Sequence, residues 1–353
     1  MKRFTYELAG TCLVLATLVL ATLVVPGSVH ARDLTIVSWG GAYQAAQRKA
    51  YFEPFMKATS DKLLEEEYNG EMAKIKAMVE INNVTWDVVQ VEAPELVRGC
   101  EEGLFEKIDW AKVGGQKQFI PAAVKTCGVG TIVWSVVLAY DGDKIKSGPK
   151  SWADFWNVKK WPGKRGLRKG AKFTLEIALM ADGVAPDKVY DVLGTKAGQE
   201  RAFKKLDELK PSIQWWEAGS QPPQWLASGD VAMTSAYNGR IAAANKEGKH
   251  FKIVWNGQNY AVDSWTIVKG SPNRDVAYKF IQFASQPQHQ KDLSIAIPYG
   301  PTNASAVSRV PTNVAVDLPT APENLKHAVA NNTEFWVEHG VDLDERFNAW
   351  ASR

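Results

Sequence analysis

The chain has few cysteines and histidines and lacks the motifs of the common catalytic sites. Three cysteines and five histidines occur in 353 residues, and none show the Cys-x-x-Cys or His-x-x-x-His spacing of a metal site. The sequence also has no Gly-x-Ser-x-Gly elbow, no phosphate-binding Gly-Lys-Ser/Thr loop and no Gly-x-Gly-x-x-Gly fingerprint. We therefore expect no metal ligand, no cofactor and no catalytic residue, and binding without turnover becomes the better hypothesis.

An excess of charge of either sign is also missing. The formal net charge is +3, whereas a nucleic-acid-binding protein normally carries a basic stripe with aromatic residues between the charges. We predict no nucleic-acid partner and a solvated basic face for the one basic cluster, which comprises Lys159, Lys160, Lys164, Arg165, Arg168, Lys169 and Lys172.

One long apolar run exists, and it lies near the N-terminus. Lys2 and Arg3 precede the run Leu13–Val25, and Ser28-Val29-His30-Ala31 follows with small residues at the positions that a signal peptidase recognises. The run is too short to span a bilayer comfortably. We predict a signal peptide over residues 1–31, cleaved after Ala31, and an exported protein. Cys12 precedes the apolar run instead of following it, so a lipid anchor is not expected.

Cleavage would leave two cysteines, Cys100 and Cys127. In an oxidising compartment an isolated pair of this kind forms one disulfide, which contributes about 2–4 kcal/mol to stability when it is unstrained. The pair therefore predicts a single cross-link.

Strand and helix patterns alternate along the exported part, which predicts an α/β fold with a mainly parallel sheet. Strands are predicted at Leu34–Ser38, Lys62–Tyr68, Asp87–Val91, Thr131–Tyr140, Val231–Ser235, Phe251–Asn256 and Ser264–Val268. Helices are predicted at Ala42–Thr59, Glu71–Asn82, Glu95–Glu102, from Ser151, and at Phe173–Asp182, Pro186–Leu193, Gln199–Leu209, Pro223–Ser228 and Pro272–Ser285. The exported part is longer than one hydrophobic core usually requires, so two lobes are expected. The first lobe would comprise residues 32–139 plus 264–307, and the second residues 140–263 plus 308–353.

Aromatic and acidic residues stand where predicted strands end. Gly40 and Gly41 let the chain turn after the first strand and present aromatic rings at its carboxyl end, where open α/β sheets bind small molecules. The candidate aromatic residues are Trp39, Tyr43, Tyr237 and Tyr299, and the candidate carboxylates are Glu92 and Asp263. An aromatic cage with a carboxylate binds a cationic amine. Core packing and surface or capping acids are the alternative interpretation of these residues.

Four segments, in this order, resemble those of the periplasmic solute-binding proteins of ABC importers. They are Ser38–Tyr43, Ala236–Arg240, Val262–Ser264 and Ile297–Asn303, and the resemblance is greatest to the spermidine/putrescine-binding group and its 4-aminobutyrate-binding relatives. It implies a two-lobed, type II-like periplasmic binding fold, in which each lobe is a mainly parallel sheet flanked by helices and hinge strands join the lobes. It also implies a periplasmic monomer that delivers a small amine or amino-acid ligand to an inner-membrane permease.

The resemblance also implies roles for single residues. Trp39, Tyr43, Tyr237 and Tyr299 match aromatic positions of the family's ligand site, and Asp263 matches the acid that holds an ammonium group. Glu92 falls where polyamine binders usually have a small hydroxyl residue, so it is either a second amine anchor or a rim charge.

One departure from polyamine binders concerns the stretch Arg168–Thr174, which has no acid before Glu176. A long polycation would meet a positive wall there, and one like-charge contact at about 4 Å costs roughly 4 kcal/mol at an effective dielectric constant near 20. Arg240 follows the Tyr237-Asn238-Gly239 turn and could clamp a carboxylate with two hydrogen bonds. These observations favour a short zwitterion, with its amine at Asp263 and its carboxylate at Arg240.

Three alternatives stay open from the sequence. The first is a polyamine-binding protein in which Glu92 and Glu176 replace the missing acids. The second is a secreted hydrolase that uses Asp263 or Glu92 as a base. The third is a sensory or structural envelope protein, which would bind a partner domain and no small molecule.

Overall fold

The computed structural model describes residue 1 and residues 32–353. Apart from Met1, the predicted signal peptide lies outside the described residues, and so do Cys12 and Ala31, after which cleavage is predicted. Within the part that is described, no helix is long and apolar enough to cross a membrane. Residues 32–353 form one compact unit.

A ten-stranded sheet runs through this unit in the order β2-β1-β3-β8-β4-β7-β5-β6, with β9 beside β4 and β10 beside β8. The strands are β1 Leu34–Ser38, β2 Leu63–Glu67, β3 Val88–Val91, β4 Val129–Asp141, β5 Arg165–Arg168, β6 Ile213–Trp216, β7 Met233–Tyr237, β8 Phe251–Ile267, β9 Gly300–Pro301 and β10 Val329–Ala330. Strands β2, β1 and β3 are parallel and form what we call the first half of the sheet. Strands β7, β5 and β6 are parallel and form the second half.

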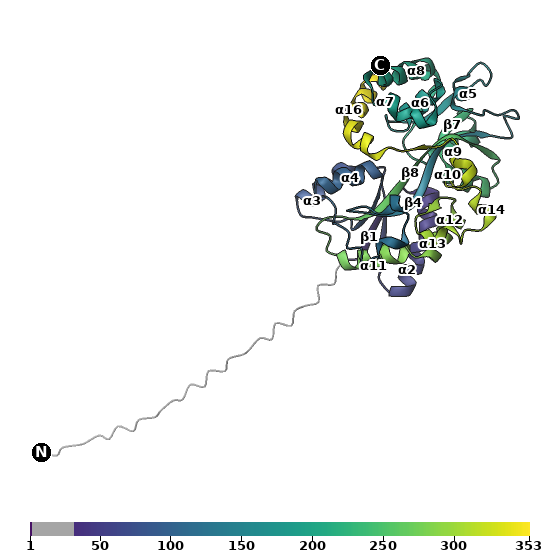
Figure 1. The fold of residues 1–353 in the computed structure, drawn as a ribbon. Helices are drawn as coiled ribbons and strands as arrows, with labels where there is room; N and C mark the ends of the chain where they lie inside the picture. The colour runs from purple at the N-terminus through teal and green to yellow at the C-terminus, as the bar shows by residue number, and fades with distance from the viewer. Residues whose placement is uncertain (2–31) are drawn as a thin grey trace. The chain divides into compact units, whose positions relative to one another are not determined.

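The two halves are joined by β4 and β8, which are long, antiparallel to each other and central in Figure 1. One part of β8 pairs with β3 of the first half, and one part of β4 pairs with β7 of the second half. Their mutual register shifts between Val136 and Leu138, close to the predicted lobe boundary at residues 139 and 140. The residue bounds of the two lobes stay a prediction.

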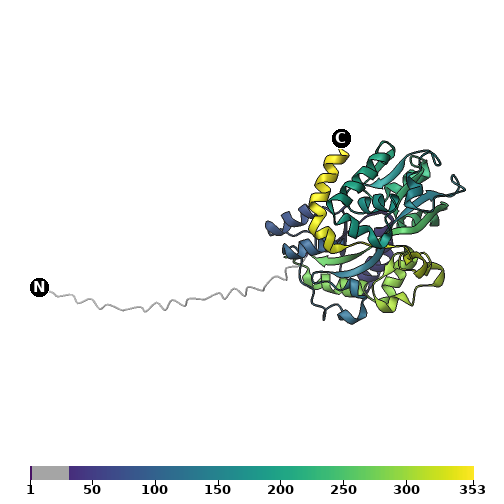
Figure 2. The ribbon, with the colours of Figure 1, turned by 45° about the horizontal axis from the view of Figure 1, so that its top comes forward.

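Helices cover both halves of the sheet (Figures 1 and 2). The α-helices are α1 Gly41–Gln47, α2 Glu53–Thr59, α3 Met72–Glu80, α4 Ala93–Glu101, α5 Trp152–Trp156, α6 Thr174–Ala181, α7 Val189–Leu193, α8 Lys196–Leu209, α9 Gln221–Ser228, α10 Asn238–Lys246, α11 Arg274–Ala284, α12 Pro287–Ala296, α13 Ala304–Val307, α14 Thr312–Ala315, α15 Pro322–Leu325 and α16 Thr333–Ala351. A π-helical turn occupies Arg48–Phe52, and 3-10 turns occupy Gln116–Gln118, Pro121–Ala123, Pro186–Lys188 and Lys210–Ser212.

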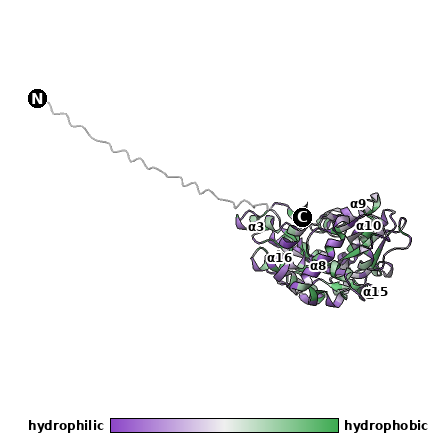
Figure 3. Cartoon of the chain, turned by 90° about the horizontal axis from the view of Figure 1, so that it is seen from above, coloured by the Kyte–Doolittle hydropathy of each residue, from purple (hydrophilic) through white to green (hydrophobic). Residues whose placement is uncertain are grey.

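Surface helices carry both hydrophilic and hydrophobic residues, as the mixed colours of α8 and α16 in Figure 3 show. Helix α8 buries Ala202, Phe203, Leu206 and Leu209, which recur at the spacing of one helix face. Helix α16 packs against α4 of the first half (Figure 2), where the Arg98 guanidinium donates to the Trp336 carbonyl at 3.0 Å.

The predicted elements agree with the structure in most places, and two differences stand out. The predicted strands Phe251–Asn256 and Ser264–Val268 are parts of one strand, β8, because the polar residues between them, Gln258 and Asn259 among them, are buried in the sheet. Several elements were not predicted, among them strands β5 and β6 and helices α10, α12 and α16. Strand β5 begins and ends with arginine, a residue type that sequence patterns assign to the exposed surface.

The predicted disulfide is present in the structure. Cys100 at the end of α4 is bonded to Cys127, just before β4, and their Cα atoms are 5.7 Å apart. The bond therefore fixes α4 to the beginning of a central strand.

Candidate functional site

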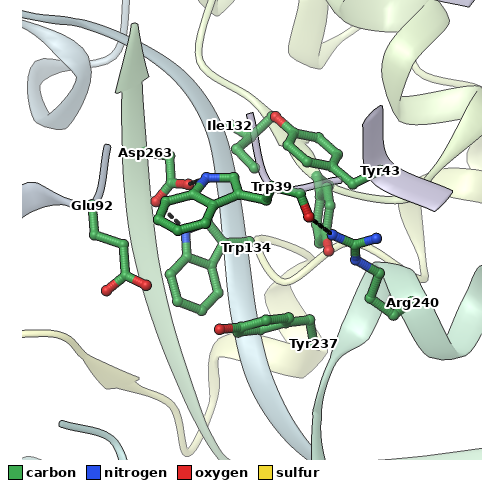
Figure 4. Close-up of a pocket in the computed structure, with 9 residues that line it drawn as sticks. Trp39, Tyr43, Glu92, Ile132, Trp134, Tyr237, Arg240 and Asp263 are labelled. Carbon is green, nitrogen blue, oxygen red and sulfur yellow. Dashed lines mark hydrogen bonds between the residues drawn. The ribbon is translucent and has the colours of Figure 1, made fainter. Parts of the chain in front are cut away.

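All seven residues predicted to bind a ligand line one cavity, which holds about 300 Å³ of empty space. They are Trp39, Tyr43, Glu92, Tyr237, Arg240, Asp263 and Tyr299, and Ile132 and Trp134 of β4 complete the lining (Figure 4). This volume includes space open to solvent, so the cavity is small and has room only for a small ligand.

The cavity lies where strands of both halves end. Trp39 follows β1 and Glu92 follows β3 in the first half, while Tyr237 ends β7 in the second half. Asp263 lies on β8, directly opposite Ile132 on β4. The central strands thus form part of the wall, and each half contributes side chains from the carboxyl ends of its parallel strands.

The turn after β1 requires its glycines. Gly40 and Gly41 have φ angles of 60° and 55°, in the left-handed region that other residues rarely adopt. A Cβ atom on Gly41 would lie only 2.7 Å from Nη1 of Arg240. The turn lets Arg240 approach the backbone and leaves Trp39 stacked on Tyr68, with ring centroids 4.7 Å apart.

Asp263 is the buried acid of the cavity, with 2% of its surface exposed. Its Oδ2 accepts hydrogen bonds from Trp39 Nε1 at 2.8 Å and from Gln90 Nε2 at 3.0 Å. Its Oδ1 accepts one from Trp134 Nε1 at 2.6 Å. Burial, with the nearby charge of Glu92, raises the pKa of Asp263 to about 8. A carboxylate has about four acceptor positions, so Oδ1 can accept one more donor.

Arg240 lies at the opposite side of the cavity from Asp263 (Figure 4). Its Nη1 donates to the Gly40 carbonyl at 2.7 Å, and its Nη2 donates to the Trp39 carbonyl at 2.8 Å. Its Nε is buried and has no hydrogen-bond partner. The guanidinium group has five N–H donors, so part of it stays available on the Nε side.

Aromatic rings separate these two charged groups. Tyr43 and Tyr299 meet edge to face, with centroids 5.2 Å apart, and Trp134 and Tyr237 do the same at 5.0 Å. Such rings supply apolar surface for a short carbon chain, and their faces attract a cation.

Glu92 is bound to two cations of the second half. Its Oε1 accepts from Arg168 Nη2 at 3.0 Å, and its Oε2 lies 2.6 Å from Lys172 Nζ. Lys172 also pairs with Glu95 at 2.9 Å. Although burial alone would raise the pKa of Glu92, the two cations lower it to about 2. We call Glu92, Glu95, Arg168 and Lys172 the ion cluster.

The contacts of the buried arginine and lysine side chains correct two predictions. The expected positive wall is wrong, because two acids neutralise its buried cations. The solvated basic face is wrong for Arg165, which is fully buried and donates to the carbonyls of Phe155 and Trp161. The face is correct for Lys159, Lys160, Lys164 and Lys169, which are exposed.

Glu176, the other acid considered for a polyamine, does not line the cavity. It is fully buried elsewhere, where its Oε1 accepts from Tyr190 and Trp336 at 2.8 and 2.9 Å. Among residues 1 and 32–353, no three His, Cys, Asp or Glu side chains come together as metal ligands would.

Sequence reasoning missed Ile132, Trp134 and Gln90. The first two lie in a predicted strand, two residues apart and thus on one face. That spacing was the available signal, because both side chains point to the same side of β4. No signal in the sequence marks Gln90, whose amide bonds Asp263 from a strand of buried residues.

Residues 50–322 match the model of a bacterial extracellular solute-binding protein family. The gamma-aminobutyric acid-binding protein of Pseudomonas aeruginosa is 58% identical over 324 residues, which are 92% of each chain. The spermidine/putrescine-binding periplasmic protein of Escherichia coli is more distant, at 23% identity over 77% of this chain and 79% of that protein.

Solved structures agree with this result. The "Atu4243-GABA receptor" is 36% identical, covers 90% of this chain and 97% of its own, and superposes with a TM-score of 0.80. The PBP MotA of A. tumefaciens B6, in complex with glucopine, is 33% identical, covers 90% of this chain and 99% of its own, and gives a TM-score of 0.85. The fold is that of the two-lobed periplasmic binding proteins, as the sequence predicted. By both sequence and structure, the chain belongs to the family of bacterial extracellular solute-binding proteins.

Proposed function

We propose that this protein is the periplasmic solute-binding component of an ABC importer and that it captures a short ω-amino acid of the 4-aminobutyrate type. The observation that carries the proposal is the placement of Asp263 and Arg240 on opposite sides of one small aromatic cavity. A ligand with an ammonium group at one end and a carboxylate at the other matches both charges at once.

The ammonium group would bind at Oδ1 of Asp263. This oxygen accepts only one hydrogen bond, whereas Oδ2 already accepts two. The indole N–H groups of Trp39 and Trp134 hold the carboxylate in place, so little side-chain ordering is left for the binding step. A positive ligand also stabilises the ionised form of this buried acid, whose pKa is raised to about 8.

The carboxylate would bind on the Nε side of Arg240. Two of the guanidinium donors are used by the Trp39 and Gly40 carbonyls, and Nε has no partner. These two bonds orient the group, so that Nε–H and a remaining N–H can face a carboxylate as a fork.

A polyamine fits this cavity less well. A diamine needs an acid for each ammonium group, and Asp263 and Glu92 are the two acids in the lining. Both oxygens of Glu92 already bind Arg168 and Lys172. The much higher identity to a gamma-aminobutyric acid-binding protein than to polyamine-binding ones supports the same choice.

Delivery to a permease requires a closed, ligand-loaded form. Two sets of contacts join the halves of the sheet across the cavity, Arg240 with the backbone after β1 and Glu92 with Arg168 and Lys172. We infer that these contacts form on closure, with β4 and β8 as the hinge strands. Export after cleavage at Ala31 and binding without turnover belong to the same proposal.

Calorimetry on the exported chain with 4-aminobutyrate, putrescine and spermidine tests the ligand class. We expect binding of 4-aminobutyrate and, at equal concentrations, weaker or no binding of the two polyamines. Preference for putrescine or spermidine would reject the zwitterion. Release of a product from any of the three compounds would reject binding without turnover.

A further inference from the structure

Glu92 has a feature that amine binding does not explain. It lines the inner cavity beside Asp263, yet its charge is directed to Arg168 and Lys172. Its side chain is 7% exposed, and those of Lys172 and Arg168 are 12% and 19% exposed. An ion pair with so little exposure costs desolvation free energy, and removing one partner leaves a charge buried without compensation. The cluster therefore calls for an explanation beyond surface solvation.

A second cavity lies on the other side of Glu92. It holds about 540 Å³ of empty space, it shares Trp39 and Glu92 with the inner cavity, and Arg168 and Lys172 line it. Nη1 of Arg168 is buried there without a hydrogen-bond partner. Glu92 thus stands between the ammonium position at Asp263 and two cations that could otherwise attract an anion.

The position of Glu92 relates to one chemical difference between ligands. In 4-aminobutyrate the carbon that carries the amine has no other polar group, whereas in glutamate the same carbon also carries a carboxylate. With the amine at Asp263 and the distal carboxylate at Arg240, this extra carboxylate would project from the amine end of the cavity. Glu92 is on that side of the cavity in Figure 4.

We propose that Glu92 makes the site selective for amines that lack an adjacent carboxylate, because it neutralises Arg168 and Lys172 and presents a negative charge beside the ammonium position. An α-carboxylate meets like charge and already paired cations, so it finds no counter-ion. Without Glu92, Arg168 would lose this carboxylate partner and Lys172 would keep only Glu95, so the two cations together would carry an uncompensated positive charge that attracts an α-carboxylate. This inference rests on the proposed placement of the ligand amine at Asp263.

The pKa of Glu92, lowered to about 2, supports the argument, because the acid then stays charged near neutral pH. The pKa of Lys172 is raised by Glu92 and Glu95 despite the opposing effect of burial. The pKa of Arg168 is also raised by Glu92, so Glu92 and its two partner cations all stay charged near neutral pH.

The test compares two ligands in three proteins by calorimetry. The ligands are 4-aminobutyrate and L-glutamate, and the proteins are the wild type, Glu92→Gln and Glu95→Gln. Glu92→Gln keeps the size of the side chain and removes its charge. Glu95→Gln is the matched control, because Glu95 binds the same Lys172 but does not line the inner cavity.

We expect the wild type to prefer 4-aminobutyrate by at least a hundredfold. In Glu92→Gln the ratio of the two affinities should shift toward glutamate by tenfold or more, and in Glu95→Gln it should change less than threefold. An unchanged ratio in Glu92→Gln would overturn the inference, and so would an equal shift in both variants. Wild-type protein that binds 4-aminobutyrate and glutamate equally would overturn it too, while leaving the proposed function intact.

Failure of the proposed function has a different signature, namely no binding of 4-aminobutyrate by the wild type. Should Glu92→Gln not fold, the wild type alone still decides, with 5-aminopentanoate and 2-aminoadipate as a second pair that differs by one carboxylate. Discrimination against the α-carboxylate must appear in both pairs, and its absence from either one rejects the inference.

Discussion

Replacing Asp263 by asparagine is the sharpest test of the amine end of the site. The change removes one negative charge and almost no volume. It also places an amide NH₂ where three N–H donors converge, from Trp39, Trp134 and Gln90. Whichever way the amide turns, its NH₂ faces at least one of these donors. We therefore expect two separate effects, one on ligand affinity and one on folding.

The affinity effect follows from the lost ion pair. A hydrogen bond to a charged group contributes about 1.5–3 kcal/mol, and breaking a buried ion pair costs about 3–5 kcal/mol. At about 1.4 kcal/mol per factor of ten, the dissociation constant for 4-aminobutyrate should rise by about a hundredfold or more. The folding effect, from donors left facing one another, is about 1–3 kcal/mol.

Titration calorimetry with 4-aminobutyrate and with butanoate measures the effect on affinity. Urea unfolding without ligand measures the effect on folding. Butanoate has the same carboxylate and no amine, so its affinity should change little between the wild type and Asp263→Asn. Two results would refute the reasoning. One is an unchanged affinity for 4-aminobutyrate, and the other is an equal loss for both ligands, which would indicate a general distortion of the cavity.

Three further predictions concern the opposite end of the cavity, a buried acid outside it and the disulfide. Arg240→Lys keeps the charge but loses the fork, so affinity for 4-aminobutyrate should fall by tenfold or more while that for butylamine stays within threefold, as calorimetry would detect. Burial raises the pKa of Glu176 to about 7. The folded state therefore holds this proton more tightly than the unfolded chain, and the resulting stability is present below about pH 4 and lost as pH rises through 7. Relative to Glu176→Gln, the wild type should lose about 1.4 kcal/mol of unfolding free energy per pH unit in that window, measured by urea unfolding, and a constant difference would contradict the shifted pKa. Replacing Cys100 and Cys127, which are 27 positions apart, by alanine should cost about 2–4 kcal/mol, and reductant should then no longer change the melting temperature.

The residues that sequence reasoning found share one property, namely that each breaks a local pattern. Trp39 precedes two glycines, and Asp263 is an acid at the start of a predicted apolar strand. Such departures are visible in one sequence, because periodicity and turn chemistry predict a different residue at those positions. The contact of these residues with a ligand stays a prediction.

Glu92 shows why the rest could not be predicted. Its partners Arg168 and Lys172 are 76 and 80 positions away, and each stretch, taken alone, is explained by an exposed charge. Pairing across that distance depends on the order of strands in the sheet, where β8, β4 and β7 separate β3 from β5. Trp134 was not predicted as a site residue for the opposite reason, because a tryptophan in an apolar strand is already explained by packing in the core.

The arrangement around Trp39 links the two ends of the site. Its indole N–H bonds Asp263, and its carbonyl accepts from Arg240, so one residue of the first half contacts both groups that we assign to the ligand's charges. Asp263 lies on a central strand, whereas Arg240 lies on α10, which comes directly after β7 and would move with the second half. If the halves separate, the bond between Arg240 and Trp39 must break, while the bond between Trp39 and Asp263 can persist, because β1, β3 and β8 are bonded in sequence through one part of the sheet. On the proposed placement of the ligand, the amine end would be preformed, and the carboxylate end would be complete only when the halves meet. A ligand with an amine alone would bind without favouring closure, and the zwitterion would favour it, which ties selection of the ligand to the form that a permease can receive.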